Sequence, residues 1–149
     1  MIPKIEHTPE ATLKATQIIA AALMAGVVST IGMVLFLINN EVIGVDVRGN
    51  LISLIMAGGS LVSLMLLSVL TIWPVKATTE FPLHTLWQRR MVIRFALLEG
   101  AALLNAVGAI VERQWWSFAL LLGIFILMIL FFPTRTRFEH FIETHTPLS

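Results

Sequence analysis

The sequence predicts an all-α integral membrane protein, a single domain of four transmembrane helices arranged as two antiparallel hairpins. The chain of 149 residues is 57% hydrophobic and only 13% charged, about half the charged fraction of a typical soluble domain. Residues 15–40, 49–75 and 114–134 contain no charged residue. Each run is long enough to cross about 30 Å of hydrocarbon as a helix. A fourth segment, residues 91–111, is equally apolar apart from an arginine and a glutamate.

The first predicted hairpin joins helices at residues 9–38 and 51–73. Thr8 can cap the first helix, and the proline that follows it suits the first helical position. Small residues at 57–60 would let another helix approach the second helix closely. Trp73 marks the end of the second helix, since tryptophan is favoured at the membrane interface.

The second predicted hairpin joins helices at residues 83–111 and 115–132. Pro82 can open the first of these helices, and the turn at residues 112–114 is too short for anything but a tight antiparallel pair. In the segment after the last helix, residues 134–144, apolar side chains recur every three or four positions. That spacing predicts a short amphipathic helix that lies on the membrane surface or docks on the bundle.

The basic residues predict the orientation of the chain in the membrane. Two of them, Arg48 and Arg113, fall on one side, and seven fall on the other: Lys4, Lys14, Lys76, Arg89, Arg90, Arg135 and Arg137. Short cytoplasmic segments carry the excess of Lys and Arg. We therefore expect both termini to be cytoplasmic.

The two halves of the chain also resemble each other. The segment that starts at Pro9 parallels the segment that starts at Pro82, and Ala25 then matches Glu99. A parallel internal duplication would relate the hairpins by a pseudo-two-fold axis along the membrane normal. Apolar helices also resemble one another by chance, so both explanations remain open.

Glu99 is the acidic residue nearest the middle of any predicted transmembrane helix. A charged side chain there costs about 2.5–3.5 kcal/mol unless it is paired or protonated. The candidate partners on other helices at a similar depth are hydroxyl groups, those of Ser29, Ser60 and Ser63. Asn105, the other strongly polar residue of this segment, is expected to bond an adjacent helix. Glu99 could instead handle a proton or another ion.

Residues 96–103, Ala-Leu-Leu-Glu-Gly-Ala-Ala-Leu, resemble the ion-carrying helix of rotary ATPase proteolipids. That resemblance implies a proton- or ion-carrying role for Glu99. It covers one helix of four. The glycine-rich repeat of the proteolipid inner helix is absent, and Glu99 lies on the first helix of its hairpin, so no family is assigned.

A basic cluster lies at the expected cytoplasmic side. It is expected to meet lipid head groups, at about 1 kcal/mol for each basic residue near an anionic surface, or to bind a specific anionic partner. Its members are Arg89, Arg90, Arg94, Arg135 and Arg137.

Cofactor, metal and catalytic sites are not expected. The chain has no cysteine, which excludes disulfides, Cys-ligated zinc and iron–sulfur clusters. The histidines and acids near the C-terminus match no metal signature, and no nucleophile–base set is recognisable. A net charge of +1 gives no reason to expect nucleic-acid binding.

Together these features predict a small non-catalytic subunit that assembles with itself or with another membrane protein. The alternative is a small channel or transporter subunit in which the Glu99 carboxyl moves protons or ions. The small size and short loops indicate a bacterial inner membrane.

Overall fold

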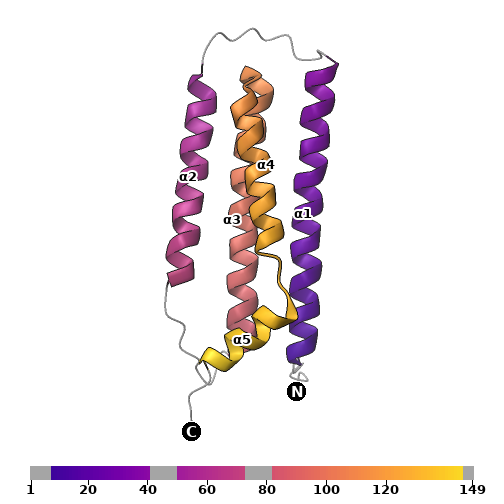
Figure 1. Ribbon diagram of the computed structural model, residues 1–149, viewed down its shortest axis with the longest axis vertical. Coiled ribbons are helices and arrows are strands. Elements are labelled where there is room, and N and C mark those ends of the chain that lie inside the picture. The colour runs from indigo at the N-terminus through magenta and orange to yellow at the C-terminus, as the bar shows by residue number, and fades with distance from the viewer. Residues whose placement is uncertain (1–7, 41–49, 73–81, 146–149) are drawn as a thin grey trace, which may run out of the picture.

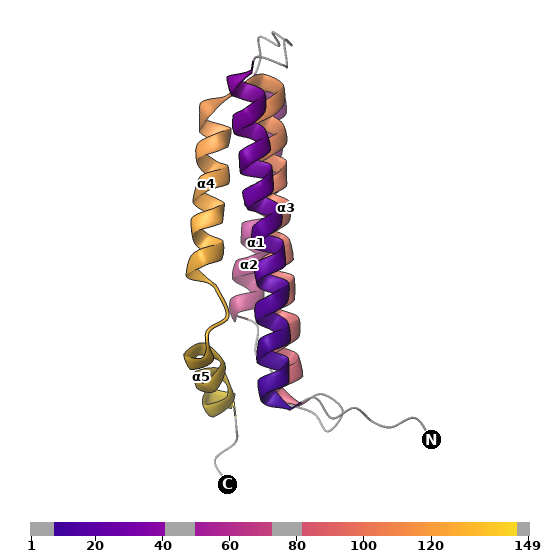
Figure 2. The ribbon, with the colours of Figure 1, turned by 90° about the vertical axis from the view of Figure 1, so that its right-hand side faces the viewer.

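The computed structural model describes residues 8–40, 50–72 and 82–145, which form five α-helices and no β-strand. These are α1 (Pro9–Asn39), α2 (Leu51–Ile72), α3 (Leu83–Glu112), α4 (Trp115–Leu130) and α5 (Arg135–His145), as Figure 1 shows. α1, α3 and α2 lie side by side in one layer, and α4 lies against one side of that layer (Figure 2). The fold is all-helical, as predicted.

Three helices, α1, α2 and α3, are long and apolar enough to cross a membrane. α4 has 16 residues, hence a length of about 24 Å at 1.5 Å per residue. α4 is long and apolar enough to cross a membrane only if it is counted together with α5, and the two helices are bent by 66° where they join. Three of the four predicted spans are therefore confirmed as candidate spans, and the fourth is a span only if this bent pair counts as one.

α4 also ends earlier than the predicted residue 132. Its helix stops at Leu130, and the backbone N–H of Phe131 still bonds the carbonyl of Leu127 at 2.9 Å. Pro133 explains the stop. A proline has no N–H to donate to a helix and disfavours the helical conformation of the residue before it. The segment after the break, α5, forms the short helix predicted for residues 134–144.

The predicted helix ends are otherwise close to those observed. The Thr8 side chain accepts a hydrogen bond of 3.4 Å from the backbone N–H of Ala11, and α3 begins directly after Pro82. Arg113 adopts a left-handed conformation with φ of 49° and turns the chain from α3 into α4. The end of α2 predicted at Trp73 lies outside the described residues.

α3 is the central helix of the bundle. It packs against α1, α2, α4 and α5, whereas α1 and α2 lie on opposite sides of it and barely touch (Figure 1). The buried face of α3 is rich in small residues, among them Ala101, Ala102, Ala106 and Ala109. Such side chains let the backbones of neighbouring helices approach closely, so α3 can accept three long neighbours.

The two predicted hairpins are therefore packed differently. Consecutive long helices are antiparallel, but α4 packs directly on α3, whereas α1 and α2 are joined mainly through their separate contacts with α3. A two-fold axis that related the hairpins would give both of them the same packing. The internal duplication stays a prediction.

Candidate functional site

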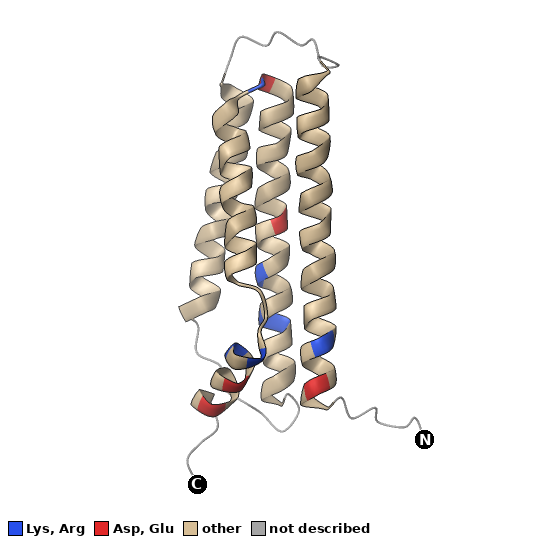
Figure 3. Ribbon diagram, turned by 45° about the vertical axis from the view of Figure 1, so that its right-hand side comes forward, with Lys and Arg blue, Asp and Glu red and all other residues tan. Residues whose placement is uncertain are grey.

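Glu99 lies in the middle of α3 and is only partly buried. Figure 3 shows an acidic band within the middle of the bundle, whereas the other acidic bands lie near its ends. The Glu99 carboxylate lies against α1 at Gly26, where an added Cβ would come within 3.0 Å of Oε1. The missing side chain of Gly26 thus makes room for this carboxylate.

Glu99 has no hydrogen-bond or ion-pair partner in the part of the chain that the structure describes. The three expected hydroxyl partners are not brought to it. The Ser60 hydroxyl bonds the carbonyls of Met56 and Ala101, the Ser63 hydroxyl bonds the carbonyl of Gly59, and Ser29 is exposed on α1. The seam between α1 and α3 therefore carries a carboxyl group that none of the described residues pairs.

Asn105 does bond an adjacent helix, as expected. Its side-chain amide Nδ2 donates to the Ser60 hydroxyl on α2 at 2.6 Å and to the carbonyl of Ala101 at 2.9 Å. Both side chains are buried. The Asn105 Oδ1 atom has no hydrogen-bond partner within the described ranges. This pair connects α2 to α3 about two turns beyond Glu99, so Asn105 and Glu99 do not form one polar site.

A second polar connection between α2 and α3 involves Glu112, which the sequence placed in a turn. Its carboxylate accepts the backbone N–H groups of Ile52 and Ser53 at 2.8 and 2.9 Å. These donors belong to the first turn of α2, where the N–H groups have no partner within their own helix. The last residue of α3 thus caps α2. No local pattern in the sequence connects positions so far apart in the chain.

The five basic residues of the predicted cluster divide among three places. Arg90, Arg94 and Arg137 line one cavity of about 570 Å³. Its other lining residues come from α2, α3 and α5, together with Phe131, which directly follows α4. Arg135 instead bonds Glu139 at 2.7 Å within α5, and Arg89 is exposed on α3.

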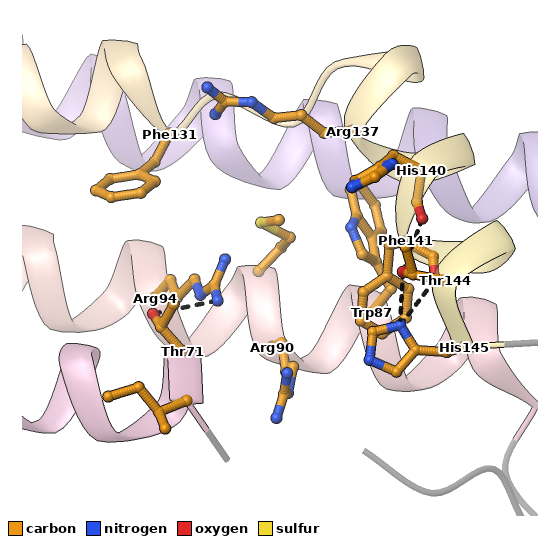
Figure 4. Close-up of a pocket in the computed structure, with 12 residues that line it drawn as sticks. Thr71, Trp87, Arg90, Arg94, Phe131, Arg137, His140, Phe141, Thr144 and His145 are labelled. Carbon is orange, nitrogen blue, oxygen red and sulfur yellow. Dashed lines mark hydrogen bonds between the residues drawn. The ribbon is translucent and has the colours of Figure 1, made fainter. Parts of the chain in front are cut away.

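Figure 4 shows this cavity, in which Arg94 lies beside Thr71 of α2. Nη2 of Arg94 donates to the Thr71 hydroxyl at 3.2 Å. Arg137 extends along the break between α4 and α5 and donates to the carbonyl of Leu130. Thr71, Trp87, His140 and His145 also line the cavity. Nothing in the local sequence indicated that these four residues would lie together, because their grouping depends on the direction that α5 takes after its bend.

One aromatic contact holds α5 against α3 beside this cavity. The rings of Trp87 and Phe138 meet edge to face with centroids 4.8 Å apart, and both residues are buried. Leu13 of α1 packs against the same cluster. Gln17 of α1 donates to the carbonyl of Pro133 at 3.0 Å, which fixes the break before α5 to α1.

Within the described residues, no group of three or more side chains is arranged to hold a metal ion. No protein family, curated protein or solved structure matches the chain.

Proposed function

We propose that the chain is a non-catalytic membrane subunit that assembles with copies of itself or with another membrane protein through the seam between α1 and α3. In this proposal the chain lies in a bacterial inner membrane, and both ends face the cytoplasm. The single observation that supports it best is the unpaired Glu99 carboxyl at that seam.

The energy of an unpaired carboxyl favours a partner from outside the chain. A charged group facing hydrocarbon costs about 2.5–3.5 kcal/mol, and a hydrogen-bond donor on a second chain would remove much of that cost. Buried or intramembrane acids are rare for this reason and mark sites of interaction or transport.

The surface around Glu99 suits a close helix contact. Ala96 lies one turn before Glu99 on α3, and Ala22 lies one turn before Gly26 on α1; both are exposed. Ser29, one turn after Gly26, is also exposed and offers a hydroxyl. Small residues on both helices would let a further helix reach the carboxyl, as small residues do in other membrane interfaces.

Native mass spectrometry of the full chain in mild detergent tests the assembly. We expect an oligomer in the unmodified chain and in Glu99→Gln, because glutamine still forms hydrogen bonds, and we expect Glu99→Leu to dissociate. Leu61→Ala, at an exposed position of α2 on the other side of α3 from α1, is the matched control and should leave the assembly intact. The chain is also purified from its native membrane, to find out whether another membrane protein stays bound to it. If the unmodified chain is a monomer and no such protein is retained, the proposal is overturned.

A flux assay separates this proposal from the channel or transporter alternative, which the same carboxyl supports. The chain is reconstituted into proteoliposomes with a pH gradient. The subunit proposal expects no difference in flux between the unmodified chain and Glu99→Gln. Proton or ion movement that is present in the unmodified chain and lost in Glu99→Gln would replace the proposal with the alternative.

A further inference from the structure

The cavity that collects the arginines lies where the described part of α2 reaches Ile72 beside the N-terminal half of α3. α5 crosses this end of α3 (Figure 1). The space that these helices leave has a volume of about 570 Å³ and is called the basic pocket below.

The described lining of the basic pocket carries charge of one sign. It includes three arginines and two histidines, and none of the described side chains that line it is acidic. The arginines come from two helices, Arg90 and Arg94 from α3 and Arg137 from α5. Bringing like charges together opposes folding, so their collection in one cavity indicates a site for a negative group.

A second cavity of the same size shows that this charge is not a general property of the region. It lies against α1 and α5 and has a volume of about 560 Å³. Lys14 and Arg135 line it together with Glu10 and Glu139, so its charges balance. It is called the mixed pocket below. The excess of positive charge is specific to the basic pocket.

The donors of the basic pocket suit a phosphate. Nη2 of Arg94 donates one hydrogen bond to the Thr71 hydroxyl. The buried Nε of Arg94 has no hydrogen-bond partner within the described residues. A guanidinium presents several N–H groups in a planar fork that matches the oxygens of a phosphate or carboxylate. Arg94 and Arg137 line the cavity from different helices, so two such forks could hold one anion.

The apolar part of the lining indicates that the anion belongs to a lipid. Ile72 lines the pocket and is 82% exposed, and Val69, one turn earlier on α2, is 50% exposed. Both belong to the apolar surface of a candidate membrane span, so the pocket opens directly beside a surface suited to acyl chains. A soluble anion would gain nothing from this arrangement.

We propose that the basic pocket binds the phosphate head group of one anionic phospholipid, whose acyl chains lie along the outer face of α2. Arg94 and Arg137 hold the phosphate oxygens, and Arg90 adds positive charge around them. This inference does not depend on the assembly proposed above, because every group in it comes from one chain.

Native mass spectrometry with added lipid tests the proposal. The full chain in mild nonionic detergent is titrated with phosphatidylglycerol, with phosphatidylcholine, or with inorganic phosphate. We expect one phosphatidylglycerol to bind per chain with about tenfold preference over phosphatidylcholine, because the two lipids share the phosphate but the choline ammonium adds a positive charge beside the arginines. Inorganic phosphate should not displace it. Equal retention of both lipids, or displacement by inorganic phosphate alone, would overturn the proposal.

Matched variants separate the basic pocket from the overall charge. Arg94→Gln and Arg137→Gln should each weaken phosphatidylglycerol binding about tenfold. Lys14→Gln removes the same charge from the mixed pocket and should change binding by less than about twofold. If circular dichroism shows that Arg94→Gln has lost helix, its loss of binding does not count. Arg137→Gln then decides the result, because Arg137 is exposed and its replacement should leave the fold intact. An equal loss of binding in Lys14→Gln would show that the lipid follows bulk charge. The oligomeric state is read from the same spectra, so failure of this proposal is distinct from failure of the assembly.

Discussion

α1 and α3 are almost equal in length, 31 and 30 residues, but the protein uses them differently. The most apolar window of α1 has a mean hydropathy of 2.4 and is 11% buried, whereas that of α3 has a mean hydropathy of 1.6 and is 50% buried. The less apolar helix is at the centre. In water the opposite would be expected, because burial of apolar area is the main driving force.

The difference is the one expected of helices that are solvated by lipid. Lipid chains solvate leucine and isoleucine as well as a protein interior does, so helices associate through close packing and hydrogen bonds instead. α3 supplies both, through its alanines and glycines and through Asn105 and Glu112. The hydroxyls of α1 that are described bond mainly within α1 itself, as Thr16 and Thr30 do. Three pairs of substitutions test this contrast.

The largest difference is expected at glycines. A Cβ at Gly108 of α3 would lie 3.2 Å from the backbone Cα of Ser53 and 3.1 Å from the Ser117 hydroxyl, whereas a Cβ at Gly32 of α1 would meet nothing within 4 Å. Gly108→Leu should destabilise the fold by about 3 kcal/mol, since a close helix contact cannot move aside. Gly32→Leu should change the stability little. Unfolding by a denaturing detergent, followed by circular dichroism, measures both, and equal effects would contradict the central role of α3.

Substitutions of leucine should show an intermediate difference in stability between α3 and α1. Leu98 of α3 is fully buried, whereas Leu35 of α1 is 50% exposed. Leu98→Ala should cost about 2 kcal/mol, because it leaves a cavity that lipid cannot fill. Leu35→Ala should be close to neutral in the same unfolding assay. A larger cost for Leu35→Ala would mean that α1 has a packed neighbour on its outer face, such as a second chain.

Substitutions of polar side chains should show the smallest difference in stability between α3 and α1. Asn105→Leu removes the hydrogen bond between α3 and α2 and should cost about 1 kcal/mol, in the range measured for such bonds in membranes. The Ser60 hydroxyl keeps its bonds to Met56 and Ala101, so no new unpaired group is created. Thr30→Val on α1 removes only a bond within one helix and should change the stability by less than about 0.5 kcal/mol. If Asn105→Leu is instead stabilising, the unpaired Oδ1 atom outweighs the bond that Nδ2 makes.

The sequence was sufficient for those parts of the fold that local chemistry decides. Thr8 and Pro82 mark helix starts, and the three residues after Val111 leave room only for a tight turn; each of these features was predicted from neighbouring residues. The length of the uncharged runs was enough to identify the three long candidate spans.

The sequence was insufficient for contacts between distant segments. All four long helices are apolar around most of their surface, so no periodic pattern indicated that α3 would be central. Gly26 matters because its missing side chain leaves space for the Glu99 carboxylate, which depends on the register of α1 against α3. The basic cluster was visible as charge, but the placement of Arg135 and Arg137 in different pockets depends on the 66° bend before α5.

The shortness of α4 has a consequence for the membrane around the protein. At about 24 Å, α4 is roughly one helical turn shorter than the hydrocarbon of an average bilayer, while α1 and α3 are longer than it. In a membrane, such a bundle would present a shorter apolar length beside α4 than beside α1 or α2. Lipid would thin beside α4, or a neighbouring chain would cover it, at a cost of a fraction of a kcal/mol per Å. Mismatch of this kind sorts proteins among membranes and regions of different thickness, so this bundle would favour thin bilayers over thick ones.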